Sequence, residues 1–124
     1  MLRTDIGGYV SPVGCRSLAV GLSCWLFAVA GGGSWWWWTV SAVSFVADYA
    51  WRSPHTAVVD RCVATVAACI TLPRAHPGAV VVAALCAVAS RSAATTTHWV
   101  VAHTCWHVAA AACVASAASL PKTM

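Results

Sequence analysis

The stretch THWVVAHTCWHVAAAACVASAASL, residues 97–120, decides the fold class of this chain. It lies within a run from residue 92 to residue 121 that has no lysine, arginine, aspartate or glutamate. A helix needs roughly 20 predominantly apolar residues to cross the hydrocarbon core of a bilayer. The threonines at 95–97 can cap such a helix, and Pro121 marks its end. The stretch is therefore predicted to be a membrane-spanning helix.

The composition of the whole chain also favours a membrane environment. Of its 124 residues, 60% are hydrophobic and 8% are charged, whereas about 25% of the residues in soluble domains are charged. A second run without charged side chains extends from residue 17 to residue 47. The net charge of +4 is small and scattered along the chain, which argues against nucleic acid as a partner. We therefore expect an integral, multi-pass membrane protein that contacts membrane lipids.

Four further apolar segments precede this helix. They cover residues 18–30, 35–51, 54–72 and 79–90. Glycines at 31–33 and four consecutive tryptophans at 35–38 predict a tight hairpin at the membrane surface, because indole rings are enriched there. Ser53 and Pro54 are typical of a helix N-cap and first turn. The segment 79–90 is short, so it spans only if it is extended or lies in thin membrane.

These segments predict an all-α fold, a multi-span transmembrane helical bundle of about five helices. Residues 1–16 are expected to form an irregular N-terminal segment, residues 17–120 the bundle, and residues 121–124 a short tail. The run 18–30 has a second interpretation as a cleaved secretory signal peptide, since it is short and follows basic residues. The distribution of arginine and lysine favours a cytoplasmic amino terminus.

Seven cysteines are spread along the chain without a C-x-x-C pair. The odd number argues against a closed disulfide framework. Most of these cysteines are expected to be small, buried apolar side chains. Cys62 and Cys69 are seven residues apart on one helical face, which makes them a weaker candidate pair of metal ligands.

The ionisable residues inside apolar segments are the main candidates for chemistry, because burying such groups in lipid costs at least about 2.5 kcal/mol. His103 and His107 are four residues apart, so both imidazoles project from one helical face and can reach one metal ion. The alternative is that each histidine bonds a serine or threonine on a neighbouring helix. A bis-histidine haem is disfavoured, since its axial ligands must approach the iron from opposite sides.

Two acidic residues and a serine lie near the ends of the predicted helices. Ser44 and Asp48 are four residues apart, so a hydroxyl and a carboxylate share a helical face. Asp48 has the same spacing to Arg52, which makes an interfacial ion pair the alternative. Asp60 lies early in the next helix, where the helix dipole favours a negative charge and Arg61 is adjacent.

The set Ser44-x3-Asp48, Asp60 and His103-x3-His107 resembles the signature of the CREST superfamily of membrane hydrolases, which includes alkaline ceramidases and progestin and adiponectin receptors. The resemblance implies that His103 and His107 are zinc ligands. It also implies that Asp60 holds or deprotonates the zinc-bound water and that Ser44 lines the site.

The chain departs from the family pattern in two ways. Asp48 stands where the family has a histidine, so the expected metal ligands are Asp48, His103 and His107, a set that zinc accepts. The chain also has fewer apolar segments than the family's bundle. Two function classes stay open: a zinc-dependent hydrolase of lipid amides or esters, and a non-catalytic helical membrane protein or small subunit of a membrane complex.

Counting chain reversals predicts where the candidate residues meet. Asp48 closes one helix and Asp60 opens the next, so the two acids share a side of the membrane. If the two following segments both span, the last helix re-enters from that side, with His103 about 10 Å below its start. We therefore expect Ser44, Asp48, Asp60, His103 and His107 to lie together near one membrane face.

Overall fold

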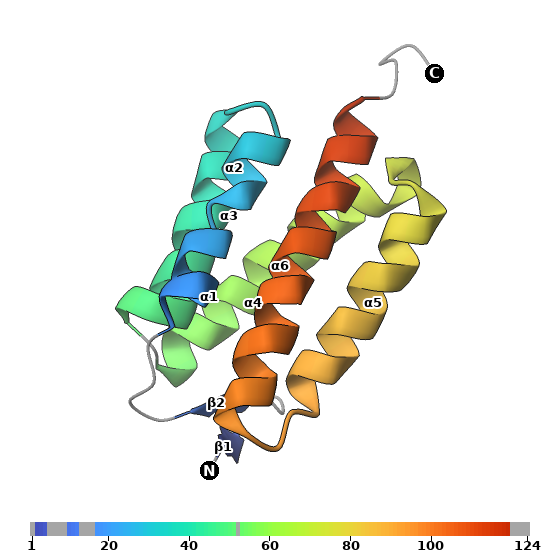
Figure 1. The fold of residues 1–124 in the computed structure, drawn as a ribbon. Helices are drawn as coiled ribbons and strands as arrows, with labels where there is room; N and C mark the ends of the chain where they lie inside the picture. The colour runs from blue at the N-terminus through green and yellow to red at the C-terminus, as the bar shows by residue number, and fades with distance from the viewer. Residues whose placement is uncertain (1, 5–9, 13–16, 52, 120–124) are drawn as a thin grey trace.

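Helices make up most of the chain in the computed structural model, which describes residues 2–4, 10–12, 17–51 and 53–119 (Figure 1). The described part contains five helical segments, residues 18–30, 35–50, 54–74, 77–91 and 96–118, which confirms a mainly helical fold of about five helices. In chain order the elements are β1 Leu2–Thr4, β2 Val10–Pro12, α1 Leu18–Ser23, α2 Leu26–Ala30, α3 Trp35–Phe45, the π-helical turn η2 Val46–Ala50, α4 Pro54–Thr71, the 3-10 turn η3 Leu72–Arg74, α5 Pro77–Arg91 and α6 Thr96–Ala118.

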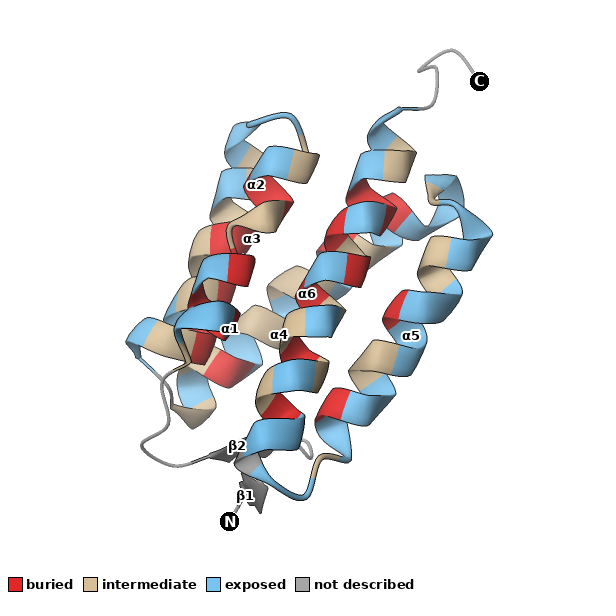
Figure 2. Cartoon of the chain, viewed as in Figure 1, coloured by how far each residue is buried: buried red, intermediate tan, exposed pale blue. Residues whose placement is uncertain are grey.

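Helix α6 holds the bundle together. It packs against α5 along most of its length and also contacts α1, α2 and α4 (Figure 1). Trp99, which is 1% exposed, and Val114 belong to the buried face of α6. Figure 2 shows that the buried residues face the interior of the bundle, whereas the outer sides of α5 and α6 are largely exposed. The exposed side chains include Val82, Leu85 and Val108, a distribution suited to contact with lipid.

The predicted hairpin between the first two apolar segments is present. Gly32 and Gly33 both have a φ of 76°, a backbone conformation that glycine adopts without steric cost. The turn folds α3 back against α2, and a β-carbon on Gly31 would lie 2.1 Å from Cδ1 of Trp37. The glycines therefore allow both the reversal and the close approach of the two helices.

Side-chain caps set the starts of the later helices. Ser53 and Thr56 form a reciprocal capping box at the start of α4, and Pro54 occupies its first turn. His76 accepts a hydrogen bond from the backbone N–H of Gly78 at the start of α5. Thr95 accepts one from the backbone N–H of His98 at the start of α6, as the sequence indicated.

The N-terminal segment differs from the irregular structure that was expected. Strands β1 and β2 pair in antiparallel register, with Leu2 opposite Pro12 and Thr4 opposite Val10. Each strand is only three residues long. Residues 5–9 and 13–16 and the tail 121–124 lie outside the described residues.

Two helices are long and apolar enough to cross a membrane. They cover Pro54–Arg74 and Thr97–Ala118. The segments Leu18–Ala30 and Pro77–Arg91 are apolar but shorter. Length and composition therefore identify two candidate spans.

Candidate metal centre

Asp48 lies at the centre of a buried polar cluster between η2 and α6. Its side chain is 1% exposed, and its Oδ2 atom is 2.9 Å from Nε2 of His103 and 3.2 Å from Nε2 of His107. Both imidazoles therefore direct the same ring nitrogen at one carboxylate oxygen. The spacing of four on α6 produces this convergence, because it places both rings on one helical face.

Each histidine ring has a serine hydroxyl at its other nitrogen, Nδ1. Ser90 of α5 places its Oγ 2.7 Å from Nδ1 of His103, and Ser23 of α1 places its Oγ 2.7 Å from Nδ1 of His107. A second-shell hydrogen bond of this kind fixes the orientation of a metal-binding imidazole. The alternative prediction, that each histidine bonds a hydroxyl on a neighbouring helix, is therefore also met.

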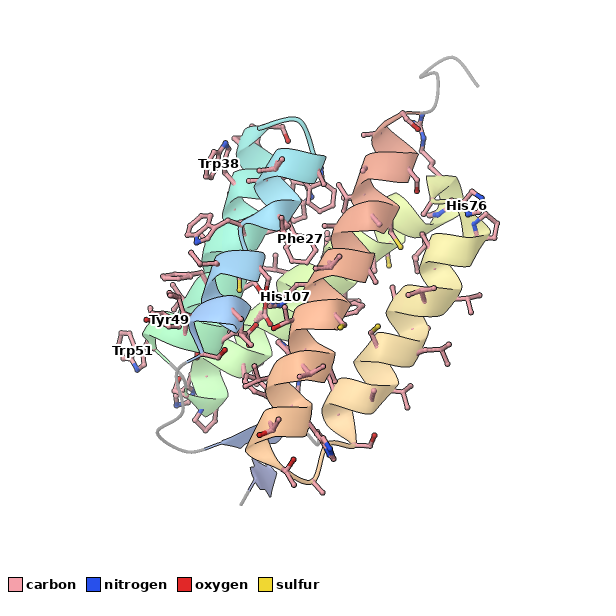
Figure 3. The ribbon with its side chains drawn as sticks, viewed as in Figure 1. Phe27, Trp38, Tyr49, Trp51, His76 and His107 are labelled. Atoms are coloured by element: carbon pink, nitrogen blue, oxygen red, sulfur yellow. The ribbon has the colours of Figure 1, made fainter. Side chains whose placement is uncertain are left out.

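Aromatic rings restrict the same two imidazoles. His103 stacks on Trp99 with ring centroids 4.8 Å apart and planes 18° apart. His107 meets the ring of Phe27 at a centroid distance of 5.8 Å. Figure 3 labels Phe27 and His107, which lie in the middle of the bundle beside α6. His107 is 1% exposed and His103 8%, so bulk water has little access to either ring.

Ser44 and Cys24 complete the cluster. The Ser44 Oγ atom is 3.4 Å from both Oδ2 of Asp48 and Nε2 of His107, and 3.5 Å from Sγ of Cys24. Sγ of Cys24 is 4.0 Å from Oδ2 of Asp48 and 3.9 Å from Nδ1 of His107. Cys24, Asp48 and His107 each offer a ligand atom within 4.8 Å of the other two.

The local backbone explains how Asp48 reaches the histidines. Asp48 lies in the π-helical turn η2, at whose end the backbone N–H of Trp51 donates to the carbonyl of Val46 over 2.8 Å. π-helical turns are rare, and those that do occur are frequently found at functional sites. The wider turn follows α3 directly, so Ser44 and Asp48 remain on the buried side of one continuous helical segment.

Asp60 and the buried cluster around Asp48 border the same cavity. It is half-buried on α4 and lines, together with Ser44, a cavity of about 100 Å³. The remaining walls are apolar and include Phe27, Val40 and Trp106. Ser44 therefore belongs both to the buried cluster and to the cavity wall.

The structure thus brings four of the five predicted residues into one set of direct contacts: Ser44, Asp48, His103 and His107. Asp60 shares the cavity with Ser44. Arg52, the alternative partner of Asp48, lies outside the described residues. The weaker candidate ligands Cys62 and Cys69 are exposed on α4.

Sequence reasoning missed three members of the cluster: Ser23, Cys24 and Ser90. Cys24 was expected to be a small, buried apolar side chain. Neither Ser23 nor Ser90 has a sequence spacing to the histidines that would indicate a contact. A signal was present for Ser23 and Cys24, which are two adjacent hydrogen-bonding or ligating residues in an otherwise apolar run.

Cys24, Asp48 and His107 could hold a metal ion, and the separations of Asp48 from the two histidines can be compared with those of a zinc site. Zinc–nitrogen and zinc–oxygen bonds of about 2.0–2.2 Å at a tetrahedral angle place neighbouring ligand atoms about 3.4 Å apart. The observed nitrogen–oxygen separations of 2.9 and 3.2 Å need only small adjustments to reach that value. With or without a bound metal, each serine hydroxyl can hydrogen-bond Nδ1 of its histidine. A hydroxyl accepts from a protonated Nδ1 or donates to an unprotonated one.

The fold and the cluster define a helical bundle with a buried aspartate and two histidines at its centre. No family model, curated protein or solved structure matches this chain.

Proposed function

We propose that this chain is an integral membrane protein that binds zinc through Asp48, His103 and His107 and hydrolyses lipid amides or esters. The observation that carries the proposal is the convergence of both Nε2 atoms on Oδ2 of Asp48, beside a cavity that Ser44 lines. When bound, zinc supplies a Lewis acid that polarises a carbonyl and activates water. The resemblance to the CREST superfamily supports the same reaction class.

The residues of this chain have separate roles in the proposal. Ser23 and Ser90 orient the two imidazoles through their Nδ1 atoms. Asp48 supplies the negative charge that offsets a cation in a buried site. Ser44 offers a hydroxyl at the boundary between the cluster and the cavity, where it can hydrogen-bond a carbonyl oxygen of the substrate. Asp60 lines the cavity, where its carboxylate would accept a proton from water.

The cavity supports a lipid as the substrate. Its walls come from α2, α3, α4, α5 and α6 and are mainly alanine, valine and aromatic side chains. Such a lining favours part of a hydrocarbon chain over a charged metabolite, because a cavity of about 100 Å³ is too small for a whole acyl chain. Ser44 and Asp60, two of the polar residues in the wall, would then contact the amide or ester bond.

Membrane integration is the first requirement. We expect the protein to remain in the membrane pellet after extraction with alkaline carbonate, because α4 and α6 are long and apolar enough to span. A peripheral membrane protein expressed in the same cells should be released. Recovery of this chain in the supernatant would contradict the bundle in lipid.

Hydrolysis is tested with purified protein in mixed micelles that contain N-acyl or O-acyl lipids. We expect fatty acid release that a chelator abolishes and added zinc restores. Asp60→Asn should lower the rate at least about 100-fold, the effect of losing a general base, while keeping bound zinc. His98→Ala is the matched control, since His98 is exposed on α6. Zinc-loaded protein that releases no fatty acid from either lipid class would contradict the hydrolase proposal.

A second candidate function is a non-catalytic membrane protein or a subunit of a membrane complex. It is favoured by the serine–histidine–aspartate contacts themselves, which join α1, η2, α5 and α6 without any added ion. Hydrogen bonds between helices in lipid contribute roughly 0.6 kcal/mol each. Metal binding separates the two candidates, because a purely structural network has no need of zinc.

A further inference from the structure

Cys24 lies at a break between α1 and α2, directly beside the metal centre. Cys24 and Trp25 form the turn between the two helices. The backbone N–H of Trp25 donates to the carbonyl of Leu22 over 3.2 Å, a three-residue spacing in place of the α-helical four. The Cys24 side chain is 0% exposed. A cysteine in the interior of the bundle is thus presented from a local distortion of the helix.

Ser41 maintains the break from the neighbouring helix. In a continuous helix the backbone N–H of Ala28 would donate to the carbonyl of Cys24. It donates instead to Oγ of Ser41 on α3 over 2.9 Å. Ser41 is itself 0% exposed, so this bond is protected from water. Because this interhelical hydrogen bond stabilises the break, the packing of α2 against α3 fixes the position of Cys24.

We infer that Sγ of Cys24 is the fourth ligand of the metal, which gives a tetrahedral centre of one thiolate, one carboxylate and two imidazoles. The inference rests on the proposed zinc site. Zinc–sulfur and zinc–oxygen bonds of about 2.3 and 2.1 Å at a tetrahedral angle separate the two ligand atoms by about 3.6 Å. The observed separation between Sγ and Oδ2 of Asp48 is 4.0 Å. Small rotations of the two side chains close that difference.

Cys24 has three further contacts, and one of them joins Sγ to Nδ1 of His107 over 3.9 Å, the ring nitrogen that Ser23 also contacts. Oγ of Ser44 lies 3.5 Å from Sγ, a contact that can orient a sulfur ligand. The thiol donates to the carbonyl of Val20 over 3.2 Å, so the metal-free side chain also has a partner. Metal binding exchanges that weak sulfur hydrogen bond for a coordinate bond.

A thiolate in the fourth position has consequences for metal choice and for regulation. Sulfur favours zinc and related softer ions over magnesium and calcium. Four protein ligands also close the coordination shell, whereas a catalytic zinc keeps one position for water. Cys24 and water then compete for one position. The rate of hydrolysis per bound zinc is therefore expected to be higher in Cys24→Ser than in the unchanged protein.

The ligand role is tested by loading the purified protein with Co²⁺, which replaces zinc and reports its ligands in the absorption spectrum. We expect the visible bands of a tetrahedral site and, in the near ultraviolet, a sulfur-to-cobalt charge-transfer band. Cys24→Ser should lose the ultraviolet band and bind Co²⁺ at least about tenfold more weakly. Cys113→Ser is the matched control, because Cys113 is also buried but lies on α6 outside this cluster.

The outcomes are distinguishable. Tetrahedral visible bands without the charge-transfer band, or a charge-transfer band that survives in Cys24→Ser, would overturn the role of Cys24 and leave the three-ligand zinc site intact. Absence of any Co²⁺ or Zn²⁺ binding by the unchanged protein would overturn the zinc site itself. Far-ultraviolet circular dichroism of Cys24→Ser, compared with the unchanged protein, checks that the bundle is still folded.

Discussion

Replacing His107 with alanine is expected to reduce zinc affinity at least about 100-fold, since removing even a second-shell partner costs about 10–100-fold. Nε2 of His107 faces Oδ2 of Asp48 and Oγ of Ser44, so the variant loses a ligand at the centre of the cluster. His103→Ala should have a comparable effect, because its Nε2 approaches the same oxygen. The affinity is measured by competition with a chromophoric chelator in detergent.

His98→Ala provides the control for these two variants. His98 lies on the same helix but is exposed, and its alanine variant should bind zinc as tightly as the unchanged protein. Equal losses in all three variants would indicate a general effect of changing α6. No loss in His103→Ala or His107→Ala would exclude these residues as ligands.

Asp48→Ala is expected to destabilise the bundle more than any other single change in the cluster. The carboxylate is the shared partner of two buried imidazoles and also contacts Ser44. Removing one partner of a buried, charge-bearing pair typically costs about 3 kcal/mol. The free energy of unfolding, measured by denaturant titration in detergent, should fall by about that amount in metal-free protein.

Asp60→Ala is the comparison for this prediction. Asp60 is half-buried at the wall of a cavity, so removing its carboxylate leaves fewer buried polar groups without a hydrogen-bond partner. Asp60→Ala should therefore lower the free energy of unfolding by clearly less than Asp48→Ala. Equal destabilisation by the two variants would contradict the central position of Asp48 in the network.

The sequence predicted the helical segments well because apolar runs alternate with strong helix-ending signals. The glycines before Trp35 and the Ser53–Pro54 pair both mark boundaries that the structure reproduces. The break at Cys24 could not be predicted, since it depends on a hydroxyl from Ser41 on another helix. The strands β1 and β2 were also missed, although two glycines between Ile6 and Tyr9 are typical of a hairpin.

The candidate site was predictable only where its residues share a helix. The spacing of four between His103 and His107, and between Ser44 and Asp48, indicates a common face from sequence alone. Ser23 is 84 positions from His107, and their contact depends on how α1 packs against α6. No local pattern encodes such a pairing. The counting of reversals placed Asp48 near the histidines because each turn between apolar segments reverses the chain.

The metal content of the unchanged protein shows whether the cluster around Asp48 binds zinc. The protein is purified in detergent without chelators, and its metals are measured by inductively coupled plasma mass spectrometry against protein concentration. We expect close to one zinc ion per chain, retained on dialysis and absent from His107→Ala. Folded protein that contains no zinc and takes up none when zinc is added would contradict it.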